Sequence, residues 1–203
     1  MRKSFVFFAI LFLSSFTSIG PTLTDKERNG AVDLLSKTEQ GVFNSLLGLN
    51  DAQLNFKPAP DRWSIAECVK HIAVTEAALW QMTDAALKQP ANPEKRSEIK
   101  ATDEQLVQMI ESRAQKVKTF TSLEPQNTSY KSTPDALASF FDSRKKLIEF
   151  VMTTNDNLRD HVVTLDKVGS FDCYQMILFM AAHSYRHTQQ IEEVKADPNF
   201  PKN

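Results

Sequence analysis

The stretch that decides the expected fold is AHSYRHTQQI, residues 182–191, because it places two imidazoles inside an apolar, helix-forming run. Four residues advance an α-helix by about 6 Å and turn it by only about 40°, so His183 and His187 share one face. Two rings on one face are able to hold one ion near the axis of a helical bundle. The chain has four histidines, so the pair alone is weak evidence, and a third ligand is needed.

His71 is the candidate third ligand. It lies about two turns into a second expected helix, which begins with the sequence WSIAECVKHI at residues 63–72. Three neutral imidazoles without an acidic ligand suit a divalent ion such as Zn, Ni or Fe, and they leave positions open for water or substrate. The alternative is that His71, His183 and His187 are partly buried helix residues bonded to their neighbours. His161 lies in a connection, and we do not include it in the site.

The N-terminus has the pattern of a secretory signal. Arg2 and Lys3 precede an apolar run from residue 5 to 13, and small residues follow as far as Gly20. We expect residues 1–20 to be a signal peptide that exports the protein to the periplasm or the medium, and residues 21–203 to be the mature domain. The run is short for a membrane span, although Pro21 disfavours cleavage after Gly20 and leaves an uncleaved anchor as the alternative.

Length and charge limit the function classes. The 203 residues carry a formal net charge of −1, so nothing basic favours binding to nucleic acid. The length suits one domain with a full core, and no internal repeat of 20–50 residues is found. A small-molecule substrate is the expected partner, and a homodimer is possible. Cys68 and Cys173 are expected to be buried free thiols, with a disulfide between them as the alternative.

Capping boxes and apolar periodicity predict a helical domain. Thr24, Ser64 and Thr102 are each followed by Glu or Gln at the third position, which is typical of a helix start. The expected helices are 24–48, 64 to about 88, 103–120, 133–155 and a last helix after Gly169-Ser170. Residues 49–62 are expected to form a packed loop, and no period-two strand pattern is found. We therefore predict an all-α domain of four main helices with 103–120 as a peripheral accessory helix.

These residues resemble the DinB/YfiT-like superfamily of bacterial four-helix bundles. The matching features are WSIAE at 63–67 leading to His71, the long connection between the second and third main helices, and HxxRHxxQI at 183–191. The resemblance covers essentially the whole mature chain. It implies up-down-down-up connectivity and a divalent metal held by His71, His183 and His187. The signal-like N-terminus and the helix 103–120 depart from the usual pattern.

The resemblance implies a metal site more firmly than a reaction. Its members include thiol-dependent transferases and isomerases that use bacillithiol, mycothiol or glutathione, and others called metal-dependent hydrolases. We expect a metal-dependent enzyme, either a hydrolase or a thiol transferase, with metal-bound water as the nucleophile. Gln190 is a candidate to orient a ligand or substrate, or else a surface residue. Arg186 is a candidate to attract an anionic substrate, or else an ion-pair partner of Glu67 or Glu76.

The second function class is a non-catalytic metal-binding or interaction module. In such a protein the ion only ties the second helix to the last one, and its coordination sphere is closed by protein ligands. The sequence offers no obvious fourth side-chain ligand on these helix faces, which favours the open, catalytic version.

Overall fold

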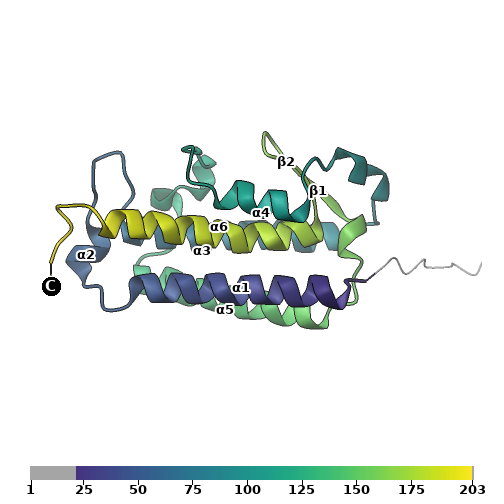
Figure 1. Cartoon of the computed structure of the whole chain (residues 1–203), viewed down its shortest axis with the longest axis horizontal. Coiled ribbons are helices and arrows are strands. Elements are labelled where there is room, and N and C mark those ends of the chain that lie inside the picture. Colours follow the sequence, from purple (N-terminus) through teal and green to yellow (C-terminus); the bar gives the residue numbers. More distant parts are fainter. Residues whose placement is uncertain (1–21, 203) are drawn as a thin grey trace, which may run out of the picture.

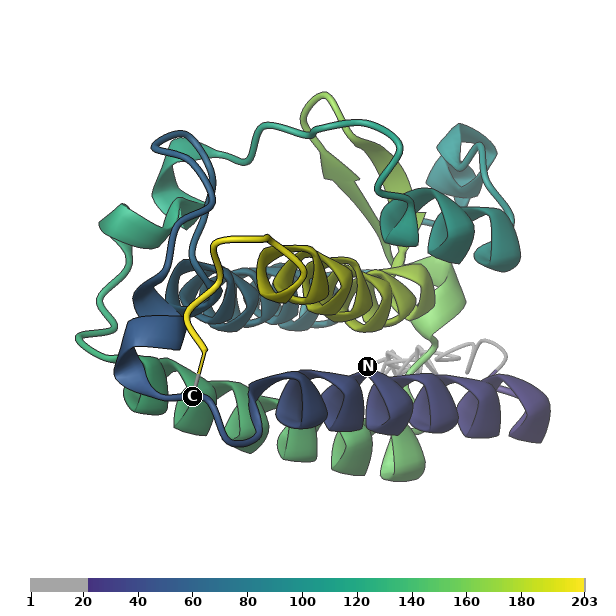
Figure 2. The same cartoon turned by 60° about the vertical axis from the view of Figure 1, so that its left-hand side comes forward.

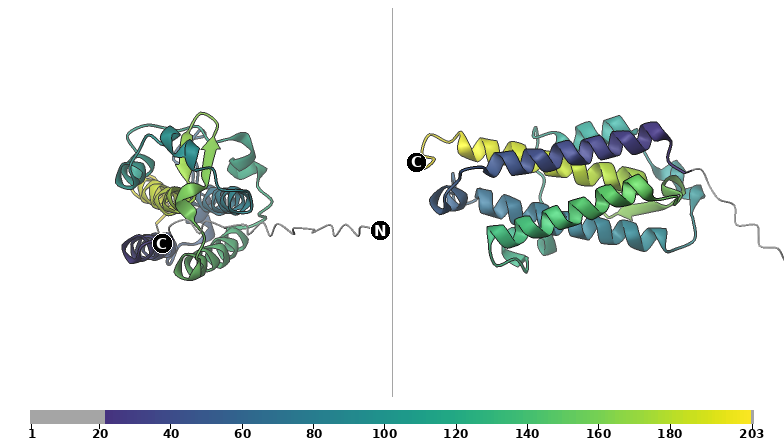
Figure 3. Two further views of the ribbon diagram at one scale, coloured as in Figure 1. Left: turned by 90° about the vertical axis from the view of Figure 1, so that its right-hand side faces the viewer. Right: turned by 90° about the horizontal axis from the view of Figure 1, so that it is seen from below.

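Four long helices form the core of the computed structural model, which describes residues 22–202 (Figure 1). They are α1 (Asp25–Leu46), α3 (Ile65–Leu87), α5 (Thr133–Thr153) and α6 (Cys173–Lys195). Both α5 and α6 lie beside α1 and α3, so consecutive long helices are not all neighbours. Helices α1 and α6 run in one direction and α3 and α5 in the other (Figures 1 and 3). The predicted all-α bundle with up-down-down-up connectivity is confirmed, whereas the predicted signal peptide 1–20 lies outside the described residues.

The predicted capping boxes set where the helices begin. At the start of α3, Ser64 Oγ accepts a hydrogen bond from the Glu67 backbone N–H at 3.2 Å, and Glu67 Oε2 accepts one from the Ser64 N–H at 2.8 Å. Thr24 and Thr102 form the same reciprocal pair with Glu27 and Gln105. Each cap contributes about 1 kcal/mol to helix stability. The cap at Ser64 therefore fixes where α3 begins, and with it the position of His71 along the axis of the bundle.

A buried polar layer divides the core into two apolar clusters. One cluster includes Leu35, Leu147 and Met176, and the other includes Ile72 and Phe140. Each long helix contributes one buried polar residue between the two clusters. These residues are Thr38 on α1, Glu76 on α3, Arg144 on α5 and Ser184 on α6. The bundle is thus apolar at both ends and hydrogen-bonded at mid-height, where α6 carries its histidines.

The smaller elements cover the side of α3 and α6 that faces away from α1 and α5 (Figure 2). They include α4 (Asp103–Glu111), the 3-10 turns η2 (Thr121–Leu123) and η3 (Pro125–Asn127), and a β-hairpin. Helix α4 packs on the outside of α6, as expected for a peripheral element. Within residues 22–202, no helix combines the length and apolarity that crossing a membrane requires.

The accessory helix is shorter than predicted. It ends at Glu111, so the prediction of helix from 112 to 120 is wrong. Leu106 is its only fully buried residue, whereas Val117 and Phe120 are 75% and 50% exposed. The apolar side chains of this second half are not buried, and it runs on as an extended connection over α6.

The prediction that no strand is present is also wrong. Strands β1 (Val162–Leu165) and β2 (Gly169–Asp172) pair antiparallel, with Val162 opposite Asp172 and Leu165 opposite Gly169. Lys167 and Gly169 have φ angles of 62° and 135° in the turn. Gly169 therefore belongs to the hairpin, and Asp172 caps α6 by accepting a hydrogen bond from the Gln175 N–H at 2.8 Å. The strands are too short to show an alternating pattern in the sequence.

Two further details differ from the sequence analysis. The loop 49–62 contains a short helix, α2 (Asp51–Asn55), although Leu54 and Phe56 pack against the core as expected. Met82, predicted to face inward, is 45% exposed because its part of α3 faces the hairpin side instead of another long helix. Cys68 and Cys173 are buried free thiols, as predicted.

Candidate metal centre

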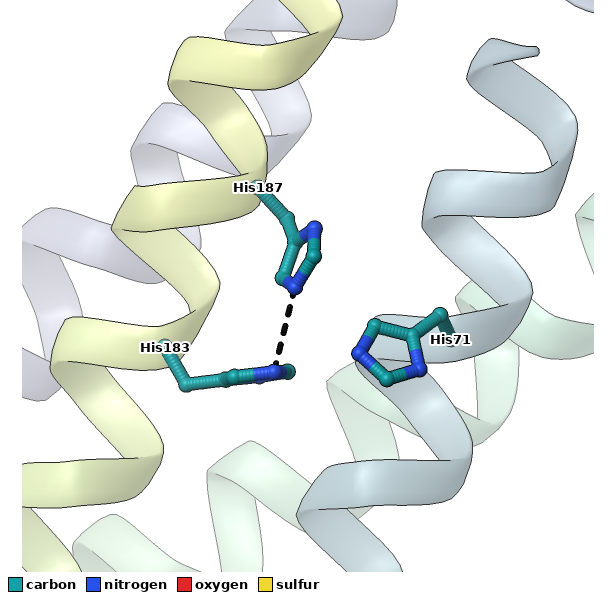
Figure 4. A group of neighbouring side chains, drawn as sticks. All are labelled: His71, His183 and His187. Carbon is teal, nitrogen blue, oxygen red and sulfur yellow. Dashed lines mark hydrogen bonds between the residues drawn. The ribbon is translucent and has the colours of Figure 1, made fainter. Parts of the chain in front are cut away.

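Three histidine rings from two helices converge beside the polar layer (Figure 4). His71 extends from α3, and His183 and His187 extend from α6 one turn apart. One ring nitrogen of each lies within 4.8 Å of the other two, and the Nε2 atoms of His183 and His187 are 3.1 Å apart. The structure thus brings together all three of the residues that the sequence suggested as ligands.

A backbone carbonyl fixes the tautomer of His71. Its Nδ1 lies 2.8 Å from the carbonyl oxygen of Leu123 in η2. A carbonyl oxygen only accepts hydrogen bonds, so the proton of the neutral ring sits on Nδ1. The lone pair is then on Nε2, which points toward the other two rings (Figure 4). A histidine held by its outer nitrogen in this way is the usual arrangement of a metal ligand.

Gln190 fixes the tautomer of His187 in the same sense. Its Oε1 lies 3.0 Å from His187 Nδ1 and also accepts a hydrogen bond from Arg113 Nη1 at 3.3 Å. Because arginine only donates, the Gln190 atom is the amide oxygen, and His187 Nδ1 is the donor. Gln190 is only 9% exposed, so the alternative of a surface glutamine is wrong. His187 therefore also turns an unprotonated Nε2 toward the centre of the cluster.

Burial keeps all three rings neutral. Burial is the main cause that lowers the pKa of His71, and it lowers the pKa values of His183 and His187 well below the ordinary value of 6.5. Repulsion between the rings adds to the effect on His183 and His187. A neutral imidazole is the form that binds a metal, so the cluster is ready to bind without first losing protons at neutral pH.

The donor set fits a divalent ion. Bonds from Zn to histidine nitrogen are about 2.0–2.1 Å, so two nitrogens 3.1 Å apart subtend about 95–100° at such an ion. The 4.8 Å spread exceeds the roughly 4 Å that two ligands of one ion span, so one ring has to move by about 1 Å on binding. No carboxylate or thiol in residues 22–202 joins the cluster. Three imidazoles and no fourth protein ligand leave the ion an open position.

Aromatic side chains enclose the cluster. Trp63 lies 4.8 Å from the His71 ring, centroid to centroid, and stacks on His187 at 6.0 Å. Phe179 stacks on His183 at 6.4 Å. His183 is partly exposed, whereas His71 and His187 are buried. His183 is thus the least buried of the three residues.

Arg186 has neither of the partners considered from the sequence. Its Nη2 donates to the backbone carbonyl of Gln115 at 2.8 Å and so attaches the connection after α4 to α6. Glu67 belongs to the α3 cap and pairs with Lys57, and Glu76 pairs with Arg144. The guanidinium of Arg186 is buried on α6, one residue away from His187 in sequence. His161 lies apart from the cluster, as expected.

Sequence reasoning missed the polar layer beneath the cluster. Arg144 Nε donates to Glu76 at 2.7 Å, Nη1 to Thr38 at 2.8 Å, and Nη2 to Ser184 at 2.8 Å. Ser184 follows His183 directly, so this network holds α6 against α3 next to the ligands. The signal in the sequence is an arginine at helical spacing between Phe140 and Leu147, in a stripe that is otherwise apolar.

The fold and the cluster together define a class, the helical bundles that present three histidines for a divalent metal. The family model of the DinB superfamily matches residues 34–191, and the chain belongs to this superfamily. It is similar to the uncharacterised protein YuaE of Bacillus subtilis (strain 168), with 23% identity over 164 residues, which cover 81% of this chain and 96% of YuaE.

A solved structure has the same fold. YfiT from Bacillus subtilis, described as a probable metal-dependent hydrolase with an unusual four-helix bundle topology, aligns with a TM-score of 0.58 and 12% identity. The alignment covers 86% of this chain and 89% of YfiT. At this identity the likeness concerns the fold, including the order and direction of the helices.

Proposed function

We propose that this protein is a metal-dependent hydrolase that acts on a small molecule, with His71, His183 and His187 as the metal ligands. The observation that carries the proposal is the convergence of three neutral imidazoles, two of which, His71 and His187, have their outer nitrogens already hydrogen-bonded at Leu123 and Gln190. A divalent ion held by these three residues would lower the pKa of a coordinated water towards about 7 and would so supply a nucleophile at neutral pH. The description of YfiT supports the same reaction class.

The residues around the cluster orient the rings and cover their faces. Leu123 and Gln190 hold two of the rings in the correct tautomer, and Trp63 and Phe179 cover the ring faces. Arg113 holds the Gln190 amide and is itself paired with Glu193 at 2.8 Å. Its charge is thus already compensated, and the open position next to the partly exposed His183 is the place for substrate.

Reconstitution tests the proposal. Protein freed of metal with a chelator is loaded with Zn, Ni or Fe(II) in turn, and metal content and hydrolysis of ester, amide and phosphoester panels are measured. We expect one ion per chain and activity that depends on it. His183→Ala should lose stoichiometric metal because one of only three ligands is removed, whereas His161→Ala should keep it. Equal metal content in the two variants would refute the ligand assignment.

A thiol transferase can use the same centre, with the thiol in the open position. The nucleophilic sulfur would then come from a cosubstrate, because burial raises the pKa values of Cys68 and Cys173 to about 12. A thiol-transfer panel run beside the hydrolase panel decides between the two. The non-catalytic alternative requires a fourth protein ligand, and residues 22–202 provide none at the cluster.

A further inference from the structure

A cavity lies along the same face of α3 as His71. It has a volume of about 710 Å³ and is lined by α3, the segment 89–92 just after it, η2 and strand β1. Apolar side chains dominate its wall, among them Ala78, Met82, Leu123, Val163 and Leu165. Small-molecule sites usually measure about 300–1,000 Å³ and are mostly apolar with a few polar groups. None of the three clustered histidines lines this cavity.

The cavity wall is held in place by hydrogen bonds. Asn92, just beyond α3, accepts from the Val162 N–H at 2.7 Å and donates to the Val162 carbonyl at 3.1 Å. Thr164 and Ser170 bond each other across the hairpin at 2.9 Å. The polar groups of Asn92 and Thr164 are thus used within the protein. The cavity does not depend on a free loop, since β1 is tied to the helix that forms its opposite wall.

His161 is a polar lining residue that carries a buried ring nitrogen without a partner. Its Nδ1 is buried and has no hydrogen-bond partner among the described residues. Burial lowers the pKa of the ring, so at neutral pH it offers one N–H donor and one acceptor nitrogen. Among the described lining residues none is Lys or Arg, and Asp166 is the one acid. This composition favours an uncharged ligand with a hydroxyl or carbonyl group over an anion.

The cavity adjoins the histidine cluster. His71, Thr75, Ala78 and Met82 follow one another on α3 at spacings of four, three and four, so they form one stripe. Ala78 lies seven residues beyond His71, which is about 10 Å along the helix axis. Leu123 links the two places, because it lines the cavity and its carbonyl oxygen accepts the hydrogen bond from His71.

We propose that this cavity binds the apolar part of the substrate, an uncharged acyl or aryl group with a hydroxyl or carbonyl placed at His161. The ligand class follows from the cavity itself, while its role as part of a substrate rests on the proposed function. The exposure of Met82, at 45%, and Phe120, at 50%, is then explained by the group that covers them in the complex.

A neutral fluorescent probe tests the cavity. N-phenyl-1-naphthylamine is titrated into the full chain, and we expect saturable binding. Met82→Lys should weaken this binding at least tenfold, because it places a charge in an apolar wall. Met109→Lys is the matched control, since Met109 is 51% exposed on α4 and lies outside the cavity, and it should bind as the unsubstituted protein does. Absence of saturable binding, or equal weakening by the two substitutions, would overturn the proposal.

Two further probes, 1-naphthol and 1-methylnaphthalene, test the role of His161. His161→Phe keeps the size of the ring and removes both nitrogens. We expect this substitution to weaken the binding of 1-naphthol roughly three- to tenfold, which is the effect of one hydrogen bond. The binding of 1-methylnaphthalene should be unchanged. Equal effects on both compounds would show that His161 does not recognise the polar group.

The same titrations separate this inference from the proposed function. All three probes should bind chelator-treated protein and His183→Ala as tightly as the metal-loaded protein, because none of the metal ligands lines the cavity. One outcome is that hydrolysis fails on every panel while the probes bind and Met82→Lys weakens their binding. In that case the inference about the cavity is supported and the proposed reaction class is wrong. If hydrolysis succeeds while the probes do not bind, the inference about the cavity is wrong and the metal-dependent activity stands.

Discussion

At the residue scale, two hydrogen bonds decide what the histidines can do. An imidazole has two nitrogens, and only one of them can donate in the neutral ring. The Leu123 carbonyl and the Gln190 amide oxygen take the outer N–H of His71 and His187, and so leave both Nε2 lone pairs in the cluster. A pair of histidines four residues apart is common, but two rings fixed from outside in this tautomer are not explained by packing alone.

Gln190→Leu should weaken metal binding by about 10- to 100-fold, because loss of the residue that orients a ligand frees the His187 ring to rotate and change tautomer. Competition with a chromophoric chelator measures the affinity. Gln189→Leu is the matched control, since Gln189 is the adjacent residue and bonds the Glu111 carbonyl at 2.9 Å instead of a histidine. The same affinity in both variants would show that Gln190 does not position His187.

At the element scale, Arg144 connects all four long helices. It donates to the Leu35 carbonyl and Thr38 on α1, to Glu76 on α3 and to Ser184 on α6, from its own place on α5. The ion pair between Arg144 and Glu76 is fully buried, with side-chain exposures of 0% and 1%. Such a pair contributes little net stability compared with apolar residues, but each charge becomes costly without its partner.

Arg144→Met should therefore lower the free energy of unfolding by about 3–5 kcal/mol, because it leaves the Glu76 carboxylate buried and unpaired. The double variant Arg144→Met with Glu76→Leu should regain most of that loss. Urea unfolding followed by circular dichroism measures both. If the double variant is no more stable than the single one, the unpaired charge is not the cause.

Arg159 connects the starts of three helices, α1, α4 and α6, at one end of the bundle. It pairs with Glu27 on α1 at 2.6 Å, Asp103 on α4 at 2.6 Å and Asp172 at the cap of α6 at 3.1 Å. Burial alone would raise the pKa of Glu27, but hydrogen bonds from Thr24 and Arg159 outweigh it and lower the pKa from 4.5 to about 2.

This shift predicts the acid stability of the fold. A folded-state pKa below the unfolded one adds stability above pH 4.5, and this stability is lost as the pH falls from about 4.5 towards 2. Glu27→Gln should thus be destabilising at pH 7 and nearly neutral close to pH 2, as measured by thermal unfolding. Glu39→Gln on the same helix should show no such loss, because burial raises the pKa of Glu39. A pH-independent effect of Glu27→Gln would contradict the assignment.

At the scale of the whole molecule, different elements cover the two sides of α3 and α6. Helices α1 and α5 complete the bundle on one side, while α4, the connection 112–132 and the hairpin cover α3 and α6 on the other (Figure 2). The histidine cluster and the cavity both lie on this second side, along α3. Substitutions in the hairpin therefore change the wall of the cavity and leave the contacts among the four long helices in place.

Export is the remaining prediction at this scale. The charged start and apolar run of residues 1–20 lead us to propose that the native protein is found outside the cytoplasm without its first ~20 residues. Mass spectrometry of the protein purified from its own cells determines the N-terminus. Recovery of intact Met1 from a soluble cytoplasmic fraction would refute export.

The sequence by itself determined the features that depend on neighbours along the chain. Apolar spacing of three and four residues defined the long helices, and capping boxes placed the starts of α1, α3 and α4. Because the spacing of His183 and His187 is local, it was readable as well. His71 was chosen as their partner from the sequence, and the structure places it there.

Only the tertiary structure decided the features that join distant segments. The carbonyl that fixes His71 belongs to Leu123, 52 residues further along the chain, and no local pattern reveals such a contact. Residues 112–120 were predicted to be helical, but Arg186 bonds the Gln115 carbonyl and that stretch lies extended across α6. The hairpin was missed because each strand has only four residues, and pairing across the turn stabilises what neither strand sequence specifies alone. Side-chain contacts between remote segments carry more free energy than local propensity, so the cavity and the tautomers of the cluster exist only in the folded protein.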